Sequence, residues 1–375
     1  MKRTKLLFLV TEDWYFCSHR LPIAREAQKK GFEIVVATRV DCHGEQITAE
    51  GFKLIPLRLL RRSTNPLSEL GAIMQLIGIY RREKPDIVHH VAMKPVLYGT
   101  LAARLTGVPH VVNALAGMGY VFISGQLKAR VLKTAIRATF RLLLNNDNSR
   151  LILQNNDDTT MFIQSGLVSK DRIRLVRGSG VDTDIYIPLP EPAGSPVVTL
   201  ASRMLWDKGI GEFVAAARLL HSRGVDARFV LVGDTDLHNP AAISAEQLAA
   251  WHSEGAVSWQ GFSDAMPTVF ARSTIVCLPS YREGLPKVLL EAAACGRPIV
   301  TTDTNGCREV VSHGVNGLLV PVRSSLELAD ALQLLIENPE LRRRMGASGR
   351  ETVVKEFAAE KVVAETMAIY EELLQ

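Results

Sequence analysis

The 375-residue sequence lacks three features that mark common classes of protein. No apolar run reaches the roughly 18 residues that a transmembrane helix needs. The five cysteines form no CxxC pair, so we expect reduced thiols in a cytosolic protein and no structural zinc. No G-x-G-x-x-G follows an apolar run, so the usual fingerprint of a nicotinamide dehydrogenase is absent.

Acidic residues are scarce in the first half of the chain. Residues 1–188 contain 27 Lys and Arg against 16 Asp and Glu, whereas the remainder contains 17 against 23. This asymmetry predicts that only the first half faces an anionic partner. Because no recognised nucleic-acid-binding motif accompanies the charge, we expect that partner not to be nucleic acid.

Short apolar runs alternate with helix-length segments along the whole chain. Continuous β-branched runs of this kind are typical of strands buried on both faces of parallel sheets. The runs cover residues 5–10, 33–38, 53–57, 86–91, 110–115, 150–155, 172–176, 196–202, 227–234, 257–262, 274–280, 298–303 and 317–321. The pattern predicts an α/β fold with two doubly wound, Rossmann-like domains that face each other across a cleft.

The domain boundaries are predicted from one break in this pattern. Four prolines and a glycine in IPLPEPAGSP (187–196) are typical of an inter-domain linker. We therefore predict a first domain over 1–187, a linker over 188–196 and a second domain over 197–357. The helical pattern continues beyond the needs of the second sheet, so a last helix over 358–375 is expected to cross back to the first domain.

Two glutamates in SYREGLPKVLLEAAACGRPIV (280–300) point to a ligand site. Pro286 suits the first turn of a helix predicted over 286–296, and Gly284 allows close approach of the backbone to a ligand. The free N–H groups that would make an anion site belong to Leu285, Lys287 and Val288. A diphosphate docked there would leave Glu283 on one side and Glu291 on the other, where each accepts hydrogen bonds from hydroxyl groups.

Two cations complete this predicted site without a metal. Arg203 and Lys208 follow the first strand of the second domain and can hold a diphosphate while its negative charge grows. The two DTD triplets, 182–184 and 234–236, are interpreted as loop aspartates that cap helices. We therefore expect no metal ion and no cofactor.

The ordered motifs resemble the family 4 glycosyltransferases of the GT-B fold, the retaining type with E-x7-E. The matching text includes RGSGVD (177–182), SRMLWDKG (202–209), VLVGD (230–234) and the segment 278–321. The resemblance implies that Arg203 and Lys208 bind the donor diphosphate, that Glu283 contacts the donor sugar and that Glu291 contacts the ribose. It also implies that the loop 304–309 lines the donor side and that the sugar is transferred with retention.

The first domain resembles bacterial enzymes that build surface polysaccharide on polyprenyl-diphosphate carriers. The similarity lies in the His-Arg pair at 19–20, in HHVAMKP (89–95) and in GMGYVF (117–122). It implies an acceptor domain, a lipid-linked saccharide acceptor and a UDP-linked hexose or N-acetylhexosamine donor. His90 and His19 are the candidate catalytic histidines, and Lys94 lies near His90. The leaving phosphate is the alternative base, and a GT-B epimerase or a silent nucleotide-sugar-binding protein is the alternative function.

A basic amphipathic helix is predicted over 125–146, a segment with no acidic residue. Its cations are Lys128, Arg130, Lys133, Arg137 and Arg141. This pattern predicts docking on an anionic membrane surface or on a lipid diphosphate, and the alternative is a core-facing helix with a solvated basic face. We therefore expect a cytoplasmic protein at the periphery of the inner membrane.

Overall fold

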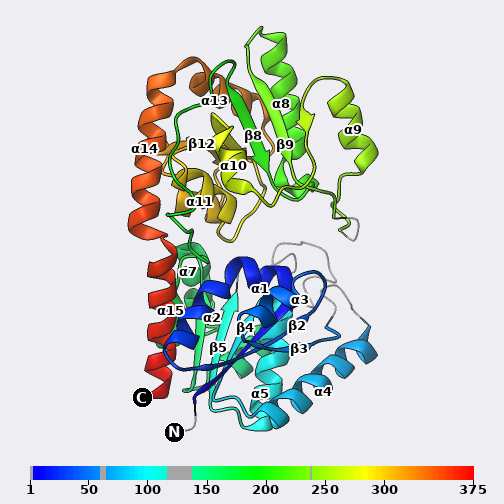
Figure 1. The fold of residues 1–375 in the computed structure, drawn as a ribbon, viewed down its shortest axis with the longest axis vertical. Coiled ribbons are helices and arrows are strands. Elements are labelled where there is room, and N and C mark those ends of the chain that lie inside the picture. Colours follow the sequence, from blue (N-terminus) through cyan, green and yellow to red (C-terminus); the bar gives the residue numbers. More distant parts are fainter. Residues whose placement is uncertain (1–2, 60–64, 116–136, 237–238) are drawn as a thin grey trace. The chain divides into compact units, whose positions relative to one another are not determined.

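The computed structural model describes residues 3–59, 65–115, 137–236 and 239–375. The chain divides into two compact units: unit 1 is Met1–Ser179 with Glu360–Gln375, and unit 2 is Gly180–Ala359. Figure 1 shows one sheet in each unit, with helices on both of its faces. Both sheets are parallel, so the predicted α/β class with two Rossmann-like domains is confirmed.

Unit 1 contains a seven-stranded sheet in the order β3-β2-β1-β4-β5-β6-β7. The order reverses at β1, and in such sheets ligands bind beyond the carboxyl ends of the strands at that reversal. The strands are β1 (Lys5–Glu12), β2 (Glu33–Arg39), β3 (Lys53–Pro56), β4 (Ile87–Val91), β5 (His110–Leu115), β6 (Ser149–Leu153) and β7 (Ile173–Leu175). The helices are α1 (Asp13–His19), α2 (Leu21–Lys29), α3 (Gly44–Ala49), α4 (Pro66–Glu83), η1 (Pro95–Gly99), α5 (Thr100–Thr106), α7 (Asn156–Gln164), η3 (Lys170–Arg172) and α15 (Ala359–Leu374).

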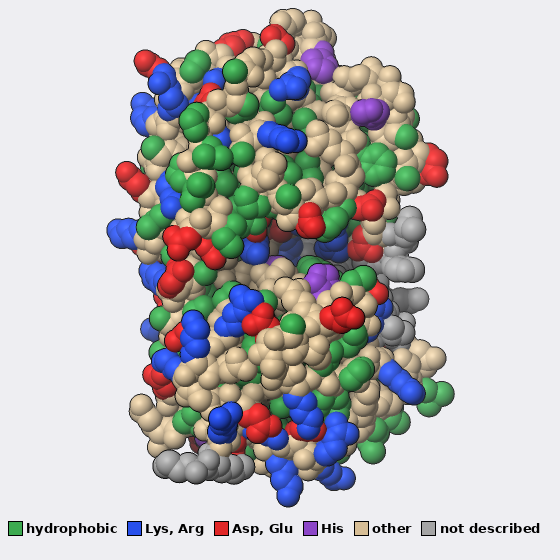
Figure 2. Space-filling view, viewed as in Figure 1, with side chains coloured by type: hydrophobic (Ala, Val, Ile, Leu, Met, Phe, Trp, Pro, Cys, Tyr) green, Lys and Arg blue, Asp and Glu red, His purple; other side chains and the backbone are tan. Residues whose placement is uncertain are grey.

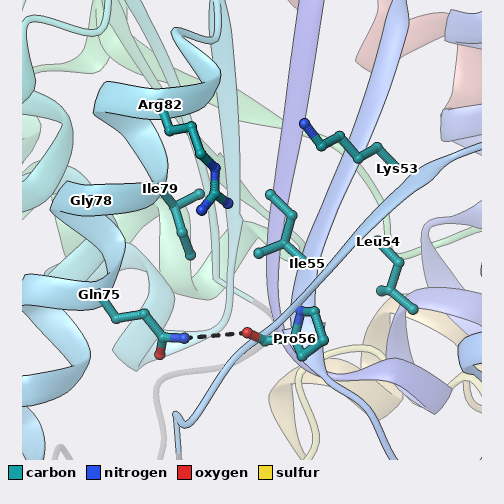
Figure 3. A pocket seen from close by; sticks show the side chains of 8 residues that line it. All are labelled: Lys53, Leu54, Ile55, Pro56, Gln75, Gly78, Ile79 and Arg82. Atoms are coloured by element: carbon teal, nitrogen blue, oxygen red, sulfur yellow. Dashed lines mark hydrogen bonds between the residues drawn. The ribbon is translucent and has the colours of Figure 1, made fainter.

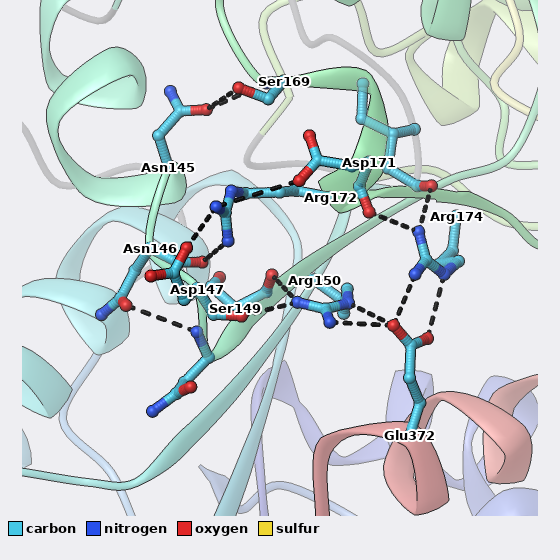
Figure 4. A network of polar contacts seen from close by, with 12 residues as sticks. Asn145, Asn146, Asp147, Ser149, Arg150, Ser169, Asp171, Arg172, Arg174 and Glu372 are labelled. Atoms are coloured by element: carbon cyan, nitrogen blue, oxygen red, sulfur yellow. Dashed lines mark hydrogen bonds and ion pairs between the residues drawn. The ribbon is translucent and has the colours of Figure 1, made fainter.

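The last helix, α15, packs in unit 1 although it comes at the end of the chain. Its buried apolar side chains share a core with β1 and β2. Tyr370 is fully buried, and its hydroxyl lies 2.5 Å from Nδ1 of His89 on β4. Figure 4 shows Glu372 held by two strand arginines, with Nε of Arg150 at 2.8 Å and Nε of Arg174 at 3.1 Å. Apolar burial and these ion pairs together anchor the helix.

Unit 2 contains a six-stranded sheet in the order β10-β9-β8-β11-β12-β13. The strands are β8 (Val197–Ala201), β9 (Arg228–Val232), β10 (Ser258–Trp259), β11 (Ile275–Leu278), β12 (Ile299–Thr302) and β13 (Gly317–Val320). The helices are η4 (Trp206–Lys208), α8 (Ile210–Ser222), α9 (Ala245–Ser253), α10 (Met266–Ala271), α11 (Lys287–Ala294), α12 (Asn305–Val310), α13 (Ser325–Glu337) and α14 (Pro339–Glu356). The order reverses beside β8 and β11, so the loops after these strands meet at one edge.

The chain passes between the units twice, at 179–180 and at 359–360, and the two passages run side by side. The N–H of Ala359 donates to the carbonyl of Val181 at 2.9 Å. Gly180 has a φ of +72°, and a Cβ atom there would lie 2.6 Å from Cα of Ala359. The close approach of these two passages therefore requires glycine.

The proline-rich segment predicted as a linker, 188–196, packs within unit 2. The largely buried Arg342 pairs with Glu191, with Nη2 and Oε2 at 2.8 Å. Arg297 also donates from Nη2 to the carbonyl of Pro190 at 3.2 Å. These buried arginines hold the segment against unit 2, so the passage between the units precedes it.

Candidate functional site

Two loops of unit 2 meet beyond the carboxyl ends of β8 and β11. Gly209, directly after η4, has a φ of +73°, and a Cβ atom there would lie 2.1 Å from the carbonyl oxygen of Pro279. The N–H of Tyr281 donates to the carbonyl of Asp207 at 2.9 Å. This contact brings Lys208, the last residue of η4, next to the loop that carries the predicted glutamate motif.

Lys208 and Glu283 form a direct ion pair. Nζ of Lys208 lies 2.5 Å from Oε1 of Glu283, and the two side chains are 19% and 11% exposed. The sequence predicts that one binds a diphosphate and the other a sugar hydroxyl, and the structure places them in contact. Partial burial strengthens such a pair, yet its remaining exposure leaves both groups open to exchange with a polar ligand.

Arg203 forms a separate pair at the same edge of the sheet. Its Nη1 lies 2.8 Å from Oδ2 of Asp236, and 40% of its side chain is exposed. Asp236 belongs to one of the two DTD triplets that were interpreted as loop aspartates. Within the described part of the chain, the structure brings Arg203 into contact with neither Lys208 nor Glu283.

Helix α11 begins beside this pair without a side-chain cap. Pro286 takes the N-cap position, so the helix covers a shorter range than the predicted 286–296. A Cβ atom on Gly306 would lie 2.4 Å from the carbonyl oxygen of Gly284, so the loop 304–309 packs against the loop that carries Glu283. A helix start without a side-chain cap favours an anion.

Glu291 lies in the second turn of α11 and is only 7% exposed. Its Oε1 accepts a hydrogen bond from the hydroxyl of Tyr186 at 3.0 Å, and Nζ of Lys287 lies 3.4 Å away. Burial raises the pKa of the Glu291 carboxyl, whereas Lys287 and Tyr186 act in the opposite direction. The sequence did not predict the role of Tyr186, because its contact with Glu291 joins residues 105 positions apart.

Three polar atoms around these loops are buried without a hydrogen-bond partner among the described residues: Ser280 Oγ, Thr304 Oγ1 and Glu212 Oε2. The hydroxyl of Tyr281 donates to the other oxygen of Glu212 at 2.7 Å, and the guanidinium of Arg323 lies 4.7 Å from the Tyr281 ring centre. Burial, followed by Glu212, raises the pKa of Tyr281 to about 12. Sequence reasoning did not single out Glu212, Tyr281 or Arg323, and buried polar atoms without a partner are suited to contact a polar ligand.

His90 lies in the polar core of unit 1. Its ring is fully buried on β4, with Nε2 at 2.9 Å from the Tyr80 hydroxyl and Nδ1 at 2.8 Å from Oδ1 of Asn113. Burial lowers the pKa of His90 to about 4, and the contact with Asn113 acts in the opposite direction. Because β4 is a central strand with every residue buried, the structure places His90 in the core of unit 1.

The other unit 1 candidates are closer to the surface. His19 ends α1, is partly exposed and stacks on Tyr15, with 4.0 Å between ring centres. Its Nδ1 lies 2.6 Å from the hydroxyl of Ser18. Nζ of Lys94 pairs with Oε1 of Glu69 at 2.7 Å. His19 is therefore the more accessible of the two candidate histidines.

Part of the predicted basic helix lies outside the described residues, namely Lys128, Arg130 and Lys133. Residues 137–144 are helical, and Arg137 and Arg141 are exposed. Arg141 donates to two carbonyl groups, to Ser165 at 2.8 Å and to Gly166 at 3.0 Å. These hydrogen bonds from Arg141 therefore connect its helix to the turn after α7.

A cavity of about 510 Å³ lies between β3 and α4 in unit 1, as Figure 3 shows. Its two cations are Lys53 and Arg82. Both pair with the buried Glu83, at 2.6 Å from Lys53 Nζ and 2.9 Å from Arg82 Nε. Both cations therefore share one carboxylate, which holds them at the wall of the cavity.

Two negative findings apply to the described ranges. No group of three or more His, Cys, Asp and Glu side chains there is arranged to hold a metal ion. No helix in those ranges combines the length and the apolar character needed to cross a membrane.

Family models match both parts of the chain. Residues 183–352 match the family described as glycosyl transferases group 1, and residues 5–156 match glycosyl transferase 4-like. The loops that carry Lys208 and Glu283, together with α11, fall within the first match, whereas His19 and His90 fall within the second.

Similar proteins cover nearly all of the chain. The N,N'-diacetylbacillosaminyl-diphospho-undecaprenol alpha-1,3-N-acetylgalactosaminyltransferase of Campylobacter jejuni is 26% identical over 90% of each chain. The alpha-maltose-1-phosphate synthase of Mycolicibacterium smegmatis is 29% identical over 83% of this chain and 84% of its own. The crystal structure of Anabaena Alr3699/HepE in complex with UDP-glucose shares the fold, with a TM-score of 0.76, 21% identity and 99% coverage of both chains.

Proposed function

We propose that this chain, a hexosyltransferase that belongs to the group 1 and 4-like glycosyltransferases, moves a hexose or N-acetylhexosamine from a UDP-linked donor to a saccharide carried on polyprenyl diphosphate. The observation that carries the donor assignment is the Lys208–Glu283 pair beside the uncapped start of α11. It combines a cation for a diphosphate with a carboxylate for a sugar hydroxyl. The buried Glu291 lies in the second turn of the same helix.

The proposed chemistry exchanges partners within that pair. The donor diphosphate binds Lys208, Arg203 and the N–H groups at the start of α11, and Glu283 then accepts a hydrogen bond from the sugar. The bond between the anomeric carbon and the diphosphate oxygen breaks as the acceptor hydroxyl oxygen bonds to that carbon. The hydroxyl proton passes to the leaving diphosphate, whose charge the two cations stabilise. Transfer on the same face of the sugar, with retention and without metal or cofactor, is part of this proposal.

Glu291 is proposed to bind the ribose of the donor. Its carboxylate accepts from Tyr186, and the same group would accept from a ribose hydroxyl that reaches the start of α11. The UDP preference is supported by the similar fold of a protein crystallised with UDP-glucose.

The acceptor class is supported by the relative from Campylobacter jejuni, whose name specifies a diphospho-undecaprenol acceptor. The relative from Mycolicibacterium smegmatis makes a sugar phosphate, so a small phosphorylated acceptor is the second candidate. Both candidates place a phosphate-bearing molecule against the basic unit 1.

We also propose that unit 1 associates with an anionic membrane surface. On α4, Leu67, Leu70 and Met74 follow helical spacing and are 80%, 57% and 57% exposed. Figure 2 shows exposed hydrophobic side chains at the start of α4 and scattered Lys and Arg side chains across unit 1. Arg58 and Arg137 are also exposed, so this unit combines apolar contacts with positive charge, as interfacial helices do.

Calorimetric titration without added metal tests the donor site, using UDP sugars and GDP sugars in parallel. One nucleotide class is expected to bind, and Glu291→Gln to weaken that binding about tenfold or more. The matched control is Arg218→Gln, which breaks a surface pair with Glu254 in the same unit.

Other results, from this titration and from analysis of the reaction products, point to other functions. Binding that is indifferent to Glu291→Gln contradicts the ribose assignment, and no binding of any sugar nucleotide contradicts the donor site. Binding without transfer to a polyprenyl-diphosphate saccharide identifies a silent binding protein, and interconversion of the sugar nucleotide identifies an epimerase.

A further inference from the structure

Arg20 is a buried cation at the junction of α1 and α2. Only 3% of the residue is exposed. Its Nε and Nη2 atoms are buried and have no hydrogen-bond partner among the described residues. A buried charge without a partner costs several kcal/mol, so its persistence in a folded unit calls for a compensating ligand.

The chain itself supplies no carboxylate to Arg20. The undescribed segments 1–2, 60–64, 116–136 and 237–238 contain no Asp or Glu, so every acidic side chain of the protein is described. None of them lies within ion-pair distance of Arg20. The nearby Glu12 pairs with Arg39, and Asp13 accepts from the N–H groups of Asp41 and His43.

A second unpartnered group lies within electrostatic reach of Arg20. Burial lowers the pKa of His89 well below its ordinary value, and the charge of Arg20 is the next cause. Nδ1 of His89 contacts the hydroxyl of Tyr370, whereas Nε2 is buried without a partner. When Tyr370 donates to Nδ1, Nε2 carries a proton and becomes another buried donor.

The position of Arg20 in the fold favours an anion as well. Arg20 is the N-cap of α2, a nine-residue helix that begins without a side-chain cap. The positive end of the helix dipole therefore lies at the residue whose Nε and Nη2 atoms have no partner among the described residues. The α1–α2 segment directly follows β1, at the reversal in strand order where ligands of such sheets bind.

We propose that Arg20, with the start of α2, binds a phosphate group of the acceptor, and specifically the diphosphate of a polyprenyl-linked acceptor. The planar guanidinium presents Nε and Nη2 side by side, which matches two oxygens of one phosphate. The identification of the ligand as an acceptor rests on the proposed function.

The test titrates farnesyl diphosphate into the full-length protein with saturating UDP, so that the donor site is occupied. Farnesol and inorganic pyrophosphate are titrated in parallel, to separate the lipid from the phosphate. The variants are Arg20→Met and Arg20→Lys. The matched control is Arg25→Met, which removes the same side chain from the same helix at a half-exposed position paired with Glu50.

The wild-type protein is expected to bind farnesyl diphosphate and not farnesol. Arg20→Met should weaken binding at least tenfold, and Arg20→Lys should weaken it less because the charge remains while the fork is lost. The ligand-free melting temperature of Arg20→Met should stay the same or rise, because an unpaired buried charge is removed. Arg25→Met should bind as the wild type does.

Three results would overturn the inference. The first is unchanged binding of farnesyl diphosphate by Arg20→Met. The second is a lowered ligand-free melting temperature of Arg20→Met together with unchanged binding by Arg20→Lys, and the third is UDP binding without any binding of farnesyl diphosphate. The last leaves the donor assignment intact. If UDP itself fails to bind, the donor proposal fails. Pyrophosphate binding that Arg20→Met abolishes then still supports a phosphate site in unit 1.

Discussion

The charged and polar groups differ between the two units in their burial and in their partners. In unit 2, the cations that follow β8 are paired in short, partly exposed contacts, Lys208 with Glu283 and Arg203 with Asp236. In unit 1, the polar groups near the first strands are buried, and Arg20 has no counter-ion in the chain. An exposed ion pair can exchange its partner for a ligand at a small cost in free energy. A buried polar group is stabilised either by hydrogen bonds within the core or by a bound ligand.

Loop chemistry explains part of this difference. Glycines at 209 and 306 allow the loops of unit 2 to approach one another more closely than a Cβ atom would allow. In unit 1, β1 ends at Glu12 and α1 begins at Asp13, without a glycine between them. In unit 1, a helix thus takes the place of a loop directly after the first strand.

The largest expected effect comes from breaking the exposed pair of unit 2. Lys208→Ala should lower kcat/KM for sugar transfer about 100- to 1,000-fold, because a cation that stabilises the leaving diphosphate is lost. Initial-rate kinetics measure this effect, with Arg218→Ala as the control for loss of a surface pair. Equal, small losses in both variants would mean that the Lys208–Glu283 pair is structural, and the contrast between the units would disappear.

The next effect concerns the buried His90 of unit 1. Its folded-state pKa of about 4 lies below the ordinary value of 6.5, so the unfolded chain takes up the proton first as pH falls. His90 should therefore contribute stability above pH 6.5 that is lost towards pH 4, about 3 kcal/mol in total. Urea unfolding across this range should show the loss in the wild type, and a reduced loss in His90→Gln.

A control separates this effect from general acid denaturation. His221→Gln changes an exposed histidine and should leave the pH dependence of unfolding as it is in the wild type. A pH dependence that His90→Gln leaves unaltered would indicate an accessible ring and would restore His90 as a catalytic candidate.

Glu291 should show the opposite pH dependence, with a smaller size. Burial raises its folded-state pKa, so its contribution to stability is present below the unfolded value and is lost as pH rises through the folded one. Glu291→Gln should therefore gain stability relative to the wild type as pH rises from 4 to 7. Thermal unfolding at both pH values measures this gain, and a constant difference would contradict it.

The smallest expected effect tests the anchoring of α15 in unit 1. Glu372→Gln should lower the free energy of unfolding by about 0.5–1 kcal/mol, because the contacts with Arg150 and Arg174 are partly exposed. Glu371→Gln is the control, since its pair with Lys30 is more exposed. Loss of several kcal/mol would show that the ion pairs, and not apolar burial, hold the helix.

Much of the fold could be predicted because parallel strands buried on both faces appear as continuous apolar runs. Each of the predicted runs overlaps a strand, from Lys5–Glu12 to Gly317–Val320. The loop that carries Glu283 and the start of α11 could also be placed, since Pro286 and the glycines act locally. The predicted linker, 188–196, differs from the structure, in which it packs within unit 2. Its proline content marks an extended segment and does not indicate which unit the segment packs against.

The rest of the site depends on contacts between distant residues. Tyr186 reaches Glu291 across 105 positions, and Tyr281 reaches Glu212 across 69, so no local pattern marks either tyrosine. The burial of His90 likewise follows from its central strand and from Asn113 on the next one.

The sequence by itself determined the two parallel sheets and the motif of cations and glutamates, because periodicity and turn chemistry act over a few neighbouring residues. Only the tertiary structure decided which of those charges are paired and which are buried alone. Partners of Lys208 and the isolation of Arg20 depend on how strands and helices far apart in the chain pack together. Burial then sets the electrostatic cost that separates a locked core residue from one that needs a ligand.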